Sequence, residues 1–268
     1  MSFSSLIDYK RALFALVIDL RQLQSFSEKL NIEKSIQLLD DVLKRIENDS
    51  FSVAVVGEFK RGKSTFINAL LGKEILPSDI LPCSATLNRV TYGLNKLVKV
   101  IFKDGREQKI GIEQLDNYVT KLTPESEVTA ESVKEAVVYY PTHFCRNNID
   151  IIDTPGLSDD ENMTAVTLSV LPEVDAAVMV IMATAPFSES ERDFLENKLL
   201  TNDLGRVIFV VTGIDYFNRP EDADRVVKSI EGRIKKHVIE RVEQQFGKNS
   251  EEYKVYFRKL GKLKVFLL

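Results

Sequence analysis

The chain has 268 residues, of which 44% are hydrophobic, and it carries a formal net charge of −4. This length suits one α/β domain, or one domain with a helical appendage. The acidic balance argues against a nucleic-acid partner, because nucleic-acid binders usually carry an excess of basic residues. The longest uncharged apolar run is far shorter than the roughly 18 residues of a membrane span, so we expect a cytoplasmic protein whose membrane association is peripheral.

The first 49 residues are expected to be helical. Apolar side chains recur at spacings of three and four, which predicts a helical seam. Ser25 and Glu28 have the spacing of a capping box, so we expect a second helix to begin there. These helices either pack on the domain that follows or belong to a coiled-coil bundle, and we assign residues 1–49 to such a bundle or neck. The seam residues are Leu6, Tyr9, Leu13, Leu16, Leu20 and Leu23, then Ile36, Leu39, Leu43 and Ile46.

The middle of the chain begins with a short β-branched run that ends at a glycine. This run, Phe51–Val56, predicts a buried parallel strand, and a helix is expected from Gly62 to about Leu71. Residues 73–95 are expected to form an extended loop. The next expected elements are a hairpin (98–102 and 106–110), a short helix (112–122), a polar loop (123–131), and two adjacent strands (133–140 and 149–153).

The last third alternates strands with helices. We expect a weak helix at 161–171, a strand at 176–182, a helix at 189–200, and a strand at 207–212. A long helix from 221 to 246, a shorter helix and a strand at 264–267 should follow. Alternation of this kind predicts an α/β fold with a mostly parallel sheet and helices on both faces.

The strongest chemical pattern lies between the first strand and its helix. Gly57–Ser64 fits G-x-x-x-x-G-K-[S/T] in full. In such a loop the backbone amides and the helix N-terminus bind phosphate oxygens, the lysine reaches the β- and γ-phosphates, and the serine hydroxyl ligates Mg²⁺. We assign nucleotide binding to Gly57, Glu58, Lys60, Arg61, Gly62, Lys63, Ser64 and Thr65.

A second pattern, Asp153-Thr154-Pro155-Gly156, follows the strand at 149–153. A carboxylate at the end of a buried parallel strand lies at the same sheet edge as the P-loop. Asp153 is therefore a candidate to hold Mg²⁺ through water, and the Gly156 amide is a candidate contact of the γ-phosphate. Ras-like enzymes have a water-orienting glutamine next, whereas here that position is Leu157.

A third pattern, Thr212-Gly213-Ile214-Asp215, ends the strand at 207–212. An aspartate at this place accepts hydrogen bonds from guanine N1–H and N2–H₂, which adenine cannot offer together. Thr212 and Asp215 fit a guanine-reading loop, but Gly213 replaces the usual lysine, whose stem covers one face of the base. We therefore expect GTP to be preferred to ATP, with weaker binding.

The loop at 81–86 offers two hydroxyls, Ser84 and Thr86, that could complete the Mg²⁺ shell and sense the γ-phosphate. Lys60 is a candidate charge donor within the P-loop. The candidate catalytic residues are thus Lys63, Ser84 and Lys60, and the candidate Mg²⁺ ligands are Ser64, Ser84 and Asp153.

The P-loop with its helix (Gly57–Gly72), the segment Ile75–Ser84 and Asp153–Leu157 resemble the GTPase domain of bacterial dynamin-like proteins. In that family a threonine usually stands where this chain has Ser84, which favours Ser84 over Thr86. The resemblance covers roughly residues 50–268, which we assign to a dynamin-type GTPase domain. The family pattern continues past the last strand into a loop that touches guanine, so we expect the domain to be truncated at Leu268.

The resemblance implies a GTPase that converts GTP to GDP and phosphate with Mg²⁺ and turns over faster when two nucleotide faces pair in a homodimer or homo-oligomer. It also implies a role in membrane remodelling or fusion, with lipid contacts made by regions beyond this chain. Some relatives compensate charge with a P-loop basic residue, at the position of Lys60, or with a monovalent cation. Two different functions stay open as well: an Era-type GTPase of ribosome assembly, and a nucleotide-gated scaffold with little hydrolysis.

Overall fold

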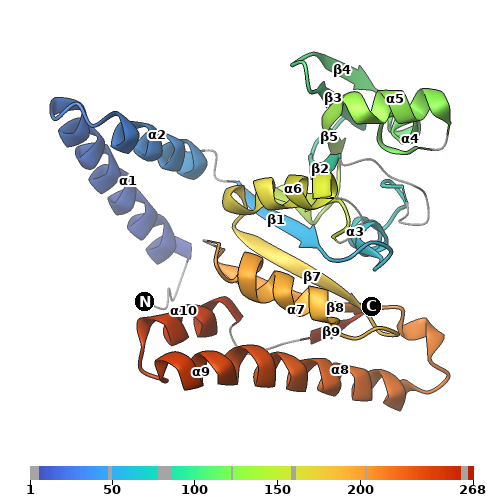
Figure 1. Cartoon of the computed structure of the whole chain (residues 1–268). Helices are drawn as coiled ribbons and strands as arrows, with labels where there is room; N and C mark the ends of the chain where they lie inside the picture. Colours follow the sequence, from blue (N-terminus) through green and yellow to red (C-terminus); the bar gives the residue numbers. More distant parts are fainter. Residues whose placement is uncertain are drawn as a thin grey trace. The chain divides into compact units, whose positions relative to one another are not determined.

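The computed structural model describes residues 6–47, 50–77, 86–121, 123–157, 161–202, 204–260 and 265–268. The chain divides into two compact units, Met1–Ser50 and Phe51–Leu268. Figure 1 shows the first unit as a pair of helices and the second as a sheet flanked by helices. Across the described part of the chain, no helix combines the length and apolar character that crossing a membrane requires.

The first unit is a helical hairpin of α1 (Leu6–Lys29) and α2 (Glu33–Glu47), which contact each other. The expected break at Ser25 is wrong, since α1 continues through Ser25 to Lys29. The chain turns at Asn31 instead, which has a left-handed φ of 54°. Asparagine tolerates this conformation at a helix C-terminus, and the Ile32 amide donates to the Ser27 carbonyl at 3.0 Å to close the turn.

The second unit contains, in its described residues, one nine-stranded sheet in the order β4-β3-β5-β2-β6-β1-β7-β8-β9. The strands β6, β1, β7, β8 and β9 run parallel to their neighbours in this order, whereas β2 is antiparallel to β6, and β3 is antiparallel to β4 and β5. Their bounds are β1 Phe51–Val56, β2 Leu87–Tyr92, β3 Leu97–Phe102, β4 Glu107–Ile110, β5 Val133–Tyr140, β6 Ile149–Asp153, β7 Ala176–Met182, β8 Arg206–Thr212 and β9 Val265–Leu267.

Helices cover both faces of this sheet, as the alternation of elements predicted. Along β1, Ala54 and Val56 join one buried apolar cluster and Val55 joins the other, because successive strand residues face opposite sides. Residues of α6, α7, α8 and α10 fill the first cluster, and residues of α3 and α4 fill the second. The bounds are α3 Lys63–Leu71, α4 Asp116–Val119, α5 Pro124–Ser132, α6 Glu161–Val170, α7 Glu189–Phe194, α8 Pro220–Ile234, α9 Glu240–Phe246 and α10 Glu251–Leu260.

Two segments expected to be loops are regular structure. The segment 73–95 contains β2, which inserts between β5 and β6, so those two strands are not adjacent as expected. The segment 123–131 is the helix α5, which begins with a capping box between Thr123 and Ser126 and a proline in its first turn.

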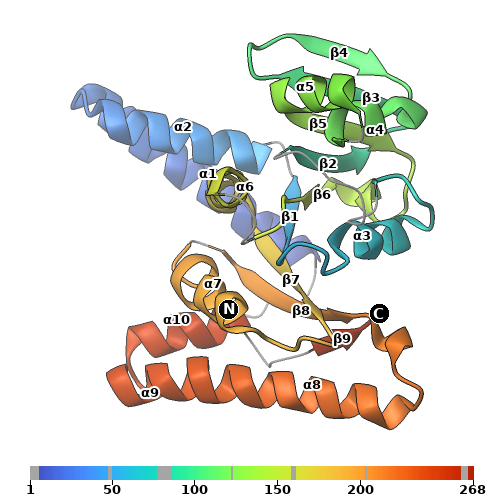
Figure 2. The ribbon, with the colours of Figure 1, turned by 45° about the vertical axis from the view of Figure 1, so that its right-hand side comes forward.

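The remaining strands and helices lie close to where the sequence predicts them, with local differences. The long helix expected from 221 to 246 is α8 and α9 joined by a π-helical turn at Lys235–Ile239, and a similar turn at Leu195–Leu199 follows α7. The short helix expected at 112–122 is a 3₁₀ turn at Ile112–Gln114 followed by α4. In Figure 2, α8 and α9 extend along one side of β8 and β9.

Candidate functional site

The P-loop follows β1 and leads directly into α3. Gly62 caps this helix with a φ of 83°, a left-handed conformation that favours glycine. Lys63 is only 2% exposed, and its Nζ donates to the Glu58 carbonyl at 3.0 Å. Its ammonium therefore folds back over the loop, as a phosphate-binding lysine requires. Thr65, two residues further along the chain in α3, is exposed.

The Ser64 hydroxyl donates to Asp153 Oδ2 at 2.7 Å, and both side chains are buried. The parallel pairing of β1 with β6 brings their carboxyl ends to the same sheet edge, so two residues 89 positions apart meet there. A hydroxyl and a carboxylate are hard oxygen donors, which suit Mg²⁺ bound by few protein ligands and by phosphate oxygens. The residues present thus fit the expected metal.

The loop after Asp153 lies against the P-loop. The Leu157 amide donates to the Gly57 carbonyl at 3.1 Å. At Gly156 the approach is very close, because an added Cβ would lie 2.7 Å from Phe59 Cα. Leu157 itself is 4% exposed and belongs to the apolar cluster, so its side chain cannot orient a water molecule.

A cleft opens beside this contact. Thr86 and Asn88 line it together with Lys63, Ser64 and Asp153. The sequence predicted a loop for both residues, but Thr86 directly precedes β2 and Asn88 lies in β2, where it pairs in register with Asp153. Ser84, the preferred switch hydroxyl, lies outside the described residues.

The candidate base-reading loop follows β8, and it contacts the P-loop at Arg61. Thr212 is buried, and its hydroxyl donates to the Arg61 carbonyl at 2.6 Å. Gly213 and Asp215 follow in a tight turn, with Asp215 exposed. The structure therefore brings Thr212 to the P-loop and leaves the Asp215 carboxylate accessible.

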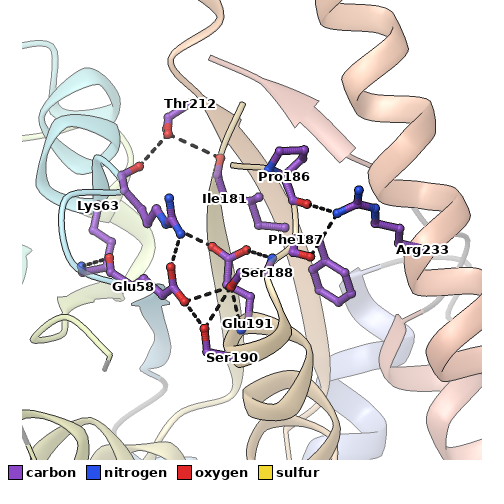
Figure 3. A network of polar contacts seen from close by, with 11 residues as sticks. Glu58, Lys63, Ile181, Pro186, Phe187, Ser188, Ser190, Glu191, Thr212 and Arg233 are labelled. Atoms are coloured by element: carbon purple, nitrogen blue, oxygen red, sulfur yellow. Dashed lines mark hydrogen bonds and ion pairs between the residues drawn. The ribbon is translucent and has the colours of Figure 1, made fainter. Parts of the chain in front are cut away.

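A polar network that the motifs did not include fastens the P-loop to the start of α7 (Figure 3). The Arg61 guanidinium contacts the carboxylate of Glu58 and lies 3.3 Å from Glu191 Oε1. Glu58 in turn accepts hydrogen bonds from the hydroxyls of Ser188 (2.9 Å) and Ser190. Arg61 and Glu58 are therefore held by neighbouring protein groups.

Lys60 differs from Arg61 in its surroundings. It is exposed and has a left-handed φ of 56°. Its Nζ lies 5.3 Å from the centroid of the Phe59 ring, which is cation–π distance. The side chain is thus placed at the rim of the P-loop rather than clamped to α7.

Comparison with known proteins identifies the family. A family model described as the dynamin family matches residues 53–214, which is more than half of the chain. The chain belongs to the dynamin family. It is 33% identical over 241 residues to a bacterial dynamin-like protein of Nostoc punctiforme, covering 85% of this chain and 33% of that protein.

A second relative is the dynamin-like protein A of Bacillus subtilis, which is 26% identical over 260 residues and covers 74% of this chain and 22% of that protein. The chain therefore spans about a third or less of the length of these two relatives. A solved bacterial dynamin pair shares the fold, with a TM-score of 0.59 at 19% identity, over 86% of this chain and 32% of that one. The matched residues 53–214 all lie in the unit Phe51–Leu268, so this unit contains a dynamin-family GTPase domain.

Burial changes the acidity of two carboxyls in this GTPase domain. Glu191 has a completely buried side chain, and burial raises its pKa from 4.5 to about 7, although Ser188 and Arg61 oppose the shift. At Glu58 burial acts in the same direction. There, however, hydrogen bonds from Ser190, Ser188 and Arg61 outweigh it and hold the pKa below its usual value.

Glu191 could have been found from the sequence only in part. Ser188 and Glu191 form a capping box at the start of α7, and this spacing is visible in the sequence. The Glu191 Oε2 atom accepts from the Ser188 amide at 2.8 Å, which is the ordinary role of such a residue. Its second contact, with Arg61 of the P-loop, depends on the sheet bringing α7 beside β1 and has no signal in the sequence.

Proposed function

We propose that this dynamin-family domain hydrolyses GTP to GDP and phosphate by in-line attack of water at the P-loop. The observation that carries the proposal is the 2.7 Å contact between the Ser64 hydroxyl and Asp153, next to the buried Lys63. These are the three side chains that the chemistry needs for the β- and γ-phosphates and for Mg²⁺. Two of them lie 89 positions apart in the sequence and meet at one sheet edge.

Each residue has a distinct role in this proposal. Lys63 and the P-loop amides hold the phosphates, and the Gly156 amide contacts the γ-phosphate. Ser64, Ser84 and Asp153 would hold Mg²⁺, which would supply positive charge to the phosphate oxygens. Thr86 is a second candidate for the switch hydroxyl, because it lines the cleft beside Ser64 and Asp153.

Charge compensation is assigned to Lys60 rather than to Arg61. The Arg61 guanidinium pairs with the carboxylates of Glu58 and Glu191, which are both largely buried. Moving it to a phosphate would take the cationic partner away from both carboxylates. Lys60 lies exposed at the rim of the same loop and makes no ion pair among the residues that the structure describes. A monovalent cation is the alternative source of positive charge, as in some members of the family.

Family membership also supports self-association and membrane action as proposals. The bacterial dynamin pair of the same fold is oligomerised and is described as providing a mechanism for the long-range sensing and tethering of membranes. We propose that the present domain likewise pairs through its nucleotide face as a homodimer or homo-oligomer, and that pairing stimulates hydrolysis. Peripheral membrane association, remodelling and fusion are proposed for the longest natural form that contains this chain.

The test of the enzymatic proposal is phosphate release measured at increasing protein concentration. We expect turnover per molecule to rise with concentration, because paired domains hydrolyse faster than single ones. Lys63→Ala is the control and should lose GTP binding. Clear GTP binding with a flat, near-zero rate would instead favour a nucleotide-gated scaffold.

Two further measurements test the choice of nucleotide and the cellular role. Competition between GTP and ATP tests Asp215, and a preference for ATP would contradict its assignment to guanine. Co-sedimentation of the longest natural form with liposomes or with ribosomes separates the membrane role from an Era-type role. The match to the dynamin family favours liposomes.

A further inference from the structure

The base-reading loop has glycine, Gly213, where the family pattern has lysine. The following 3₁₀ turn, Ile214–Tyr216, is closed by a hydrogen bond from the Tyr216 amide to the Gly213 carbonyl at 3.3 Å. Residues three apart in a 3₁₀ turn lie one above the other. The turn therefore folds the side chain of Tyr216 back over Gly213.

A side chain at position 213 would occupy the same space as the Tyr216 ring. A Cβ built on Gly213 would lie 3.1 Å from Cδ2 and 3.2 Å from Cε2 of that ring. Gly213 also has a φ of 72°, which side chains rarely adopt. The aromatic ring thus fills the position from which a lysine stem would leave the backbone.

The Tyr216 ring is also exposed, although the other apolar side chains of this turn are packed against the core. Tyr216 is 65% exposed, whereas Ile214 and Phe217 on either side of it along the turn pack against the apolar cluster. Asp215 is exposed on the same turn, and Thr212 joins this loop to the P-loop. An uncovered aromatic face is therefore held on the turn that carries the guanine-reading carboxylate.

We propose that the Tyr216 ring is the surface on which the guanine base stacks, so that Gly213 and Tyr216 together replace the lysine of the family pattern. This inference rests on the proposed GTPase function and adds a residue outside its motifs. Stacking contributes affinity for any base, because every base has a π-face. Asp215 supplies the discrimination for guanine, and Tyr216 supplies affinity.

The first experiment truncates the ring and measures binding by calorimetry with GTP and with ITP, whose base lacks the exocyclic amine. Tyr216→Ala should raise the Kd for both nucleotides by a similar factor of about ten, as the loss of one stacking contact predicts. Tyr216→Phe keeps the ring and should stay within about twofold of the wild type. In turnover, Tyr216→Ala should raise KM and leave kcat nearly unchanged, because stacking is equal in the ground and transition states.

Asp215→Ala provides the contrast. This variant should lose most of the preference for GTP over ITP, because it removes the acceptor for the exocyclic amine. Thermal unfolding of every variant shows whether the fold is kept, and the exposure of Tyr216 predicts little change in Tm.

The second experiment uses the absence of tryptophan from this chain. Tyr216→Trp introduces a single indole whose fluorescence should be quenched when GTP or GDP is added, because guanine would stack on it. Phe246→Trp on α9 is the matched control, since Phe246 is also exposed (46%) but lies on another helix, and its fluorescence should not respond.

The outcomes separate this inference from the proposed function. Wild-type protein that binds no GTP would contradict the proposed function itself. If the wild type binds GTP while Tyr216→Ala binds it equally well, or the indole at position 216 shows no quenching, then only the stacking assignment is overturned.

Discussion

Lys60 and Arg61 are adjacent basic residues of the P-loop, yet the structure gives them different surroundings. Lys60→Ala should lower stimulated kcat by roughly 100-fold, because it removes a charge donor from the transition state. Arg61→Ala should mainly raise KM, because Arg61 holds the loop through Glu58 and Glu191. Steady-state phosphate release under pairing conditions measures both, and unchanged stimulated turnover in Lys60→Ala would remove Lys60 from the mechanism.

At Gly156, we expect the addition of a single Cβ atom to weaken GTP binding. In Gly156→Ala the new Cβ would meet Phe59 Cα at 2.7 Å, so the two phosphate loops must move apart. We expect the Kd for GTP to rise at least about tenfold and the Kd for GDP to change less, because Gly156 is assigned to the γ-phosphate.

Gly232→Ala in α8 is the matched control for this substitution. Nothing lies within 4 Å of an added Cβ at Gly232, so nucleotide binding should stay unchanged. Equal Kd values for GTP in Gly156→Ala and the wild type would contradict the close contact of the two loops.

At the scale of elements, α7 is tied to the P-loop by the buried Glu191. Because burial raises its pKa to about 7 in the folded protein, Glu191 binds a proton between pH 4.5 and about 7 that the unfolded chain releases. Its contribution to the free energy of unfolding is therefore full below pH 4.5 and is lost as the pH rises through about 7. The loss amounts to about 3 kcal/mol.

Glu191→Gln tests this directly, because the amide keeps the size of the side chain and does not titrate. Urea unfolding between pH 4.5 and 8 should show a flatter pH dependence than the wild type. The control is Glu196→Gln. Glu196 lies in the π-helical turn after α7 and pairs with Arg241, and this variant should keep the wild-type slope of stability against pH. A wild-type slope in Glu191→Gln would show that another group is responsible.

Other elements show why the sequence predicted some segments and missed others. β1, β7 and β8 are apolar runs buried on both faces, so composition alone indicates them. β2 contains Asn88 and Arg89, and it becomes a strand because β5 and β6 pair with it on both sides. α5 is a polar helix whose start is fixed by a capping box. It has almost no apolar periodicity from which the sequence could predict it.

At the scale of the whole molecule, the second unit has apolar clusters on both faces of its sheet. The first unit instead exposes large apolar side chains. A chain of residues 51–268 should therefore stay folded and bind GTP within about twofold of the full chain, while it self-associates less. Calorimetry and size-exclusion chromatography measure these effects, and an unfolded 51–268 would show that the first unit is needed for the core. The exposed residues include Phe14, Leu23, Phe26, Leu30 and Leu38.

The sequence by itself was enough to predict the proposed phosphate site of this protein. Gly57–Ser64 is a contiguous segment, and its chemistry depends on local spacing between a strand and a helix. The same holds for Asp153, since an apolar strand that ends in a carboxylate can be recognised one segment at a time. The fold class followed from the alternation of strands and helices.

The tertiary structure decided the contacts between segments that are distant in sequence. It placed Thr86 and Asn88 in the cleft and fastened Arg61 to Glu191. Within a single turn, it also laid the Tyr216 ring over Gly213. Such contacts depend on which strands pair and on the direction in which a turn places its side chains. The spacing of residues in the sequence predicts neither the pairing nor the direction. The sequence therefore predicts the nucleotide chemistry, and the packing shows which side chains lie beside the predicted site.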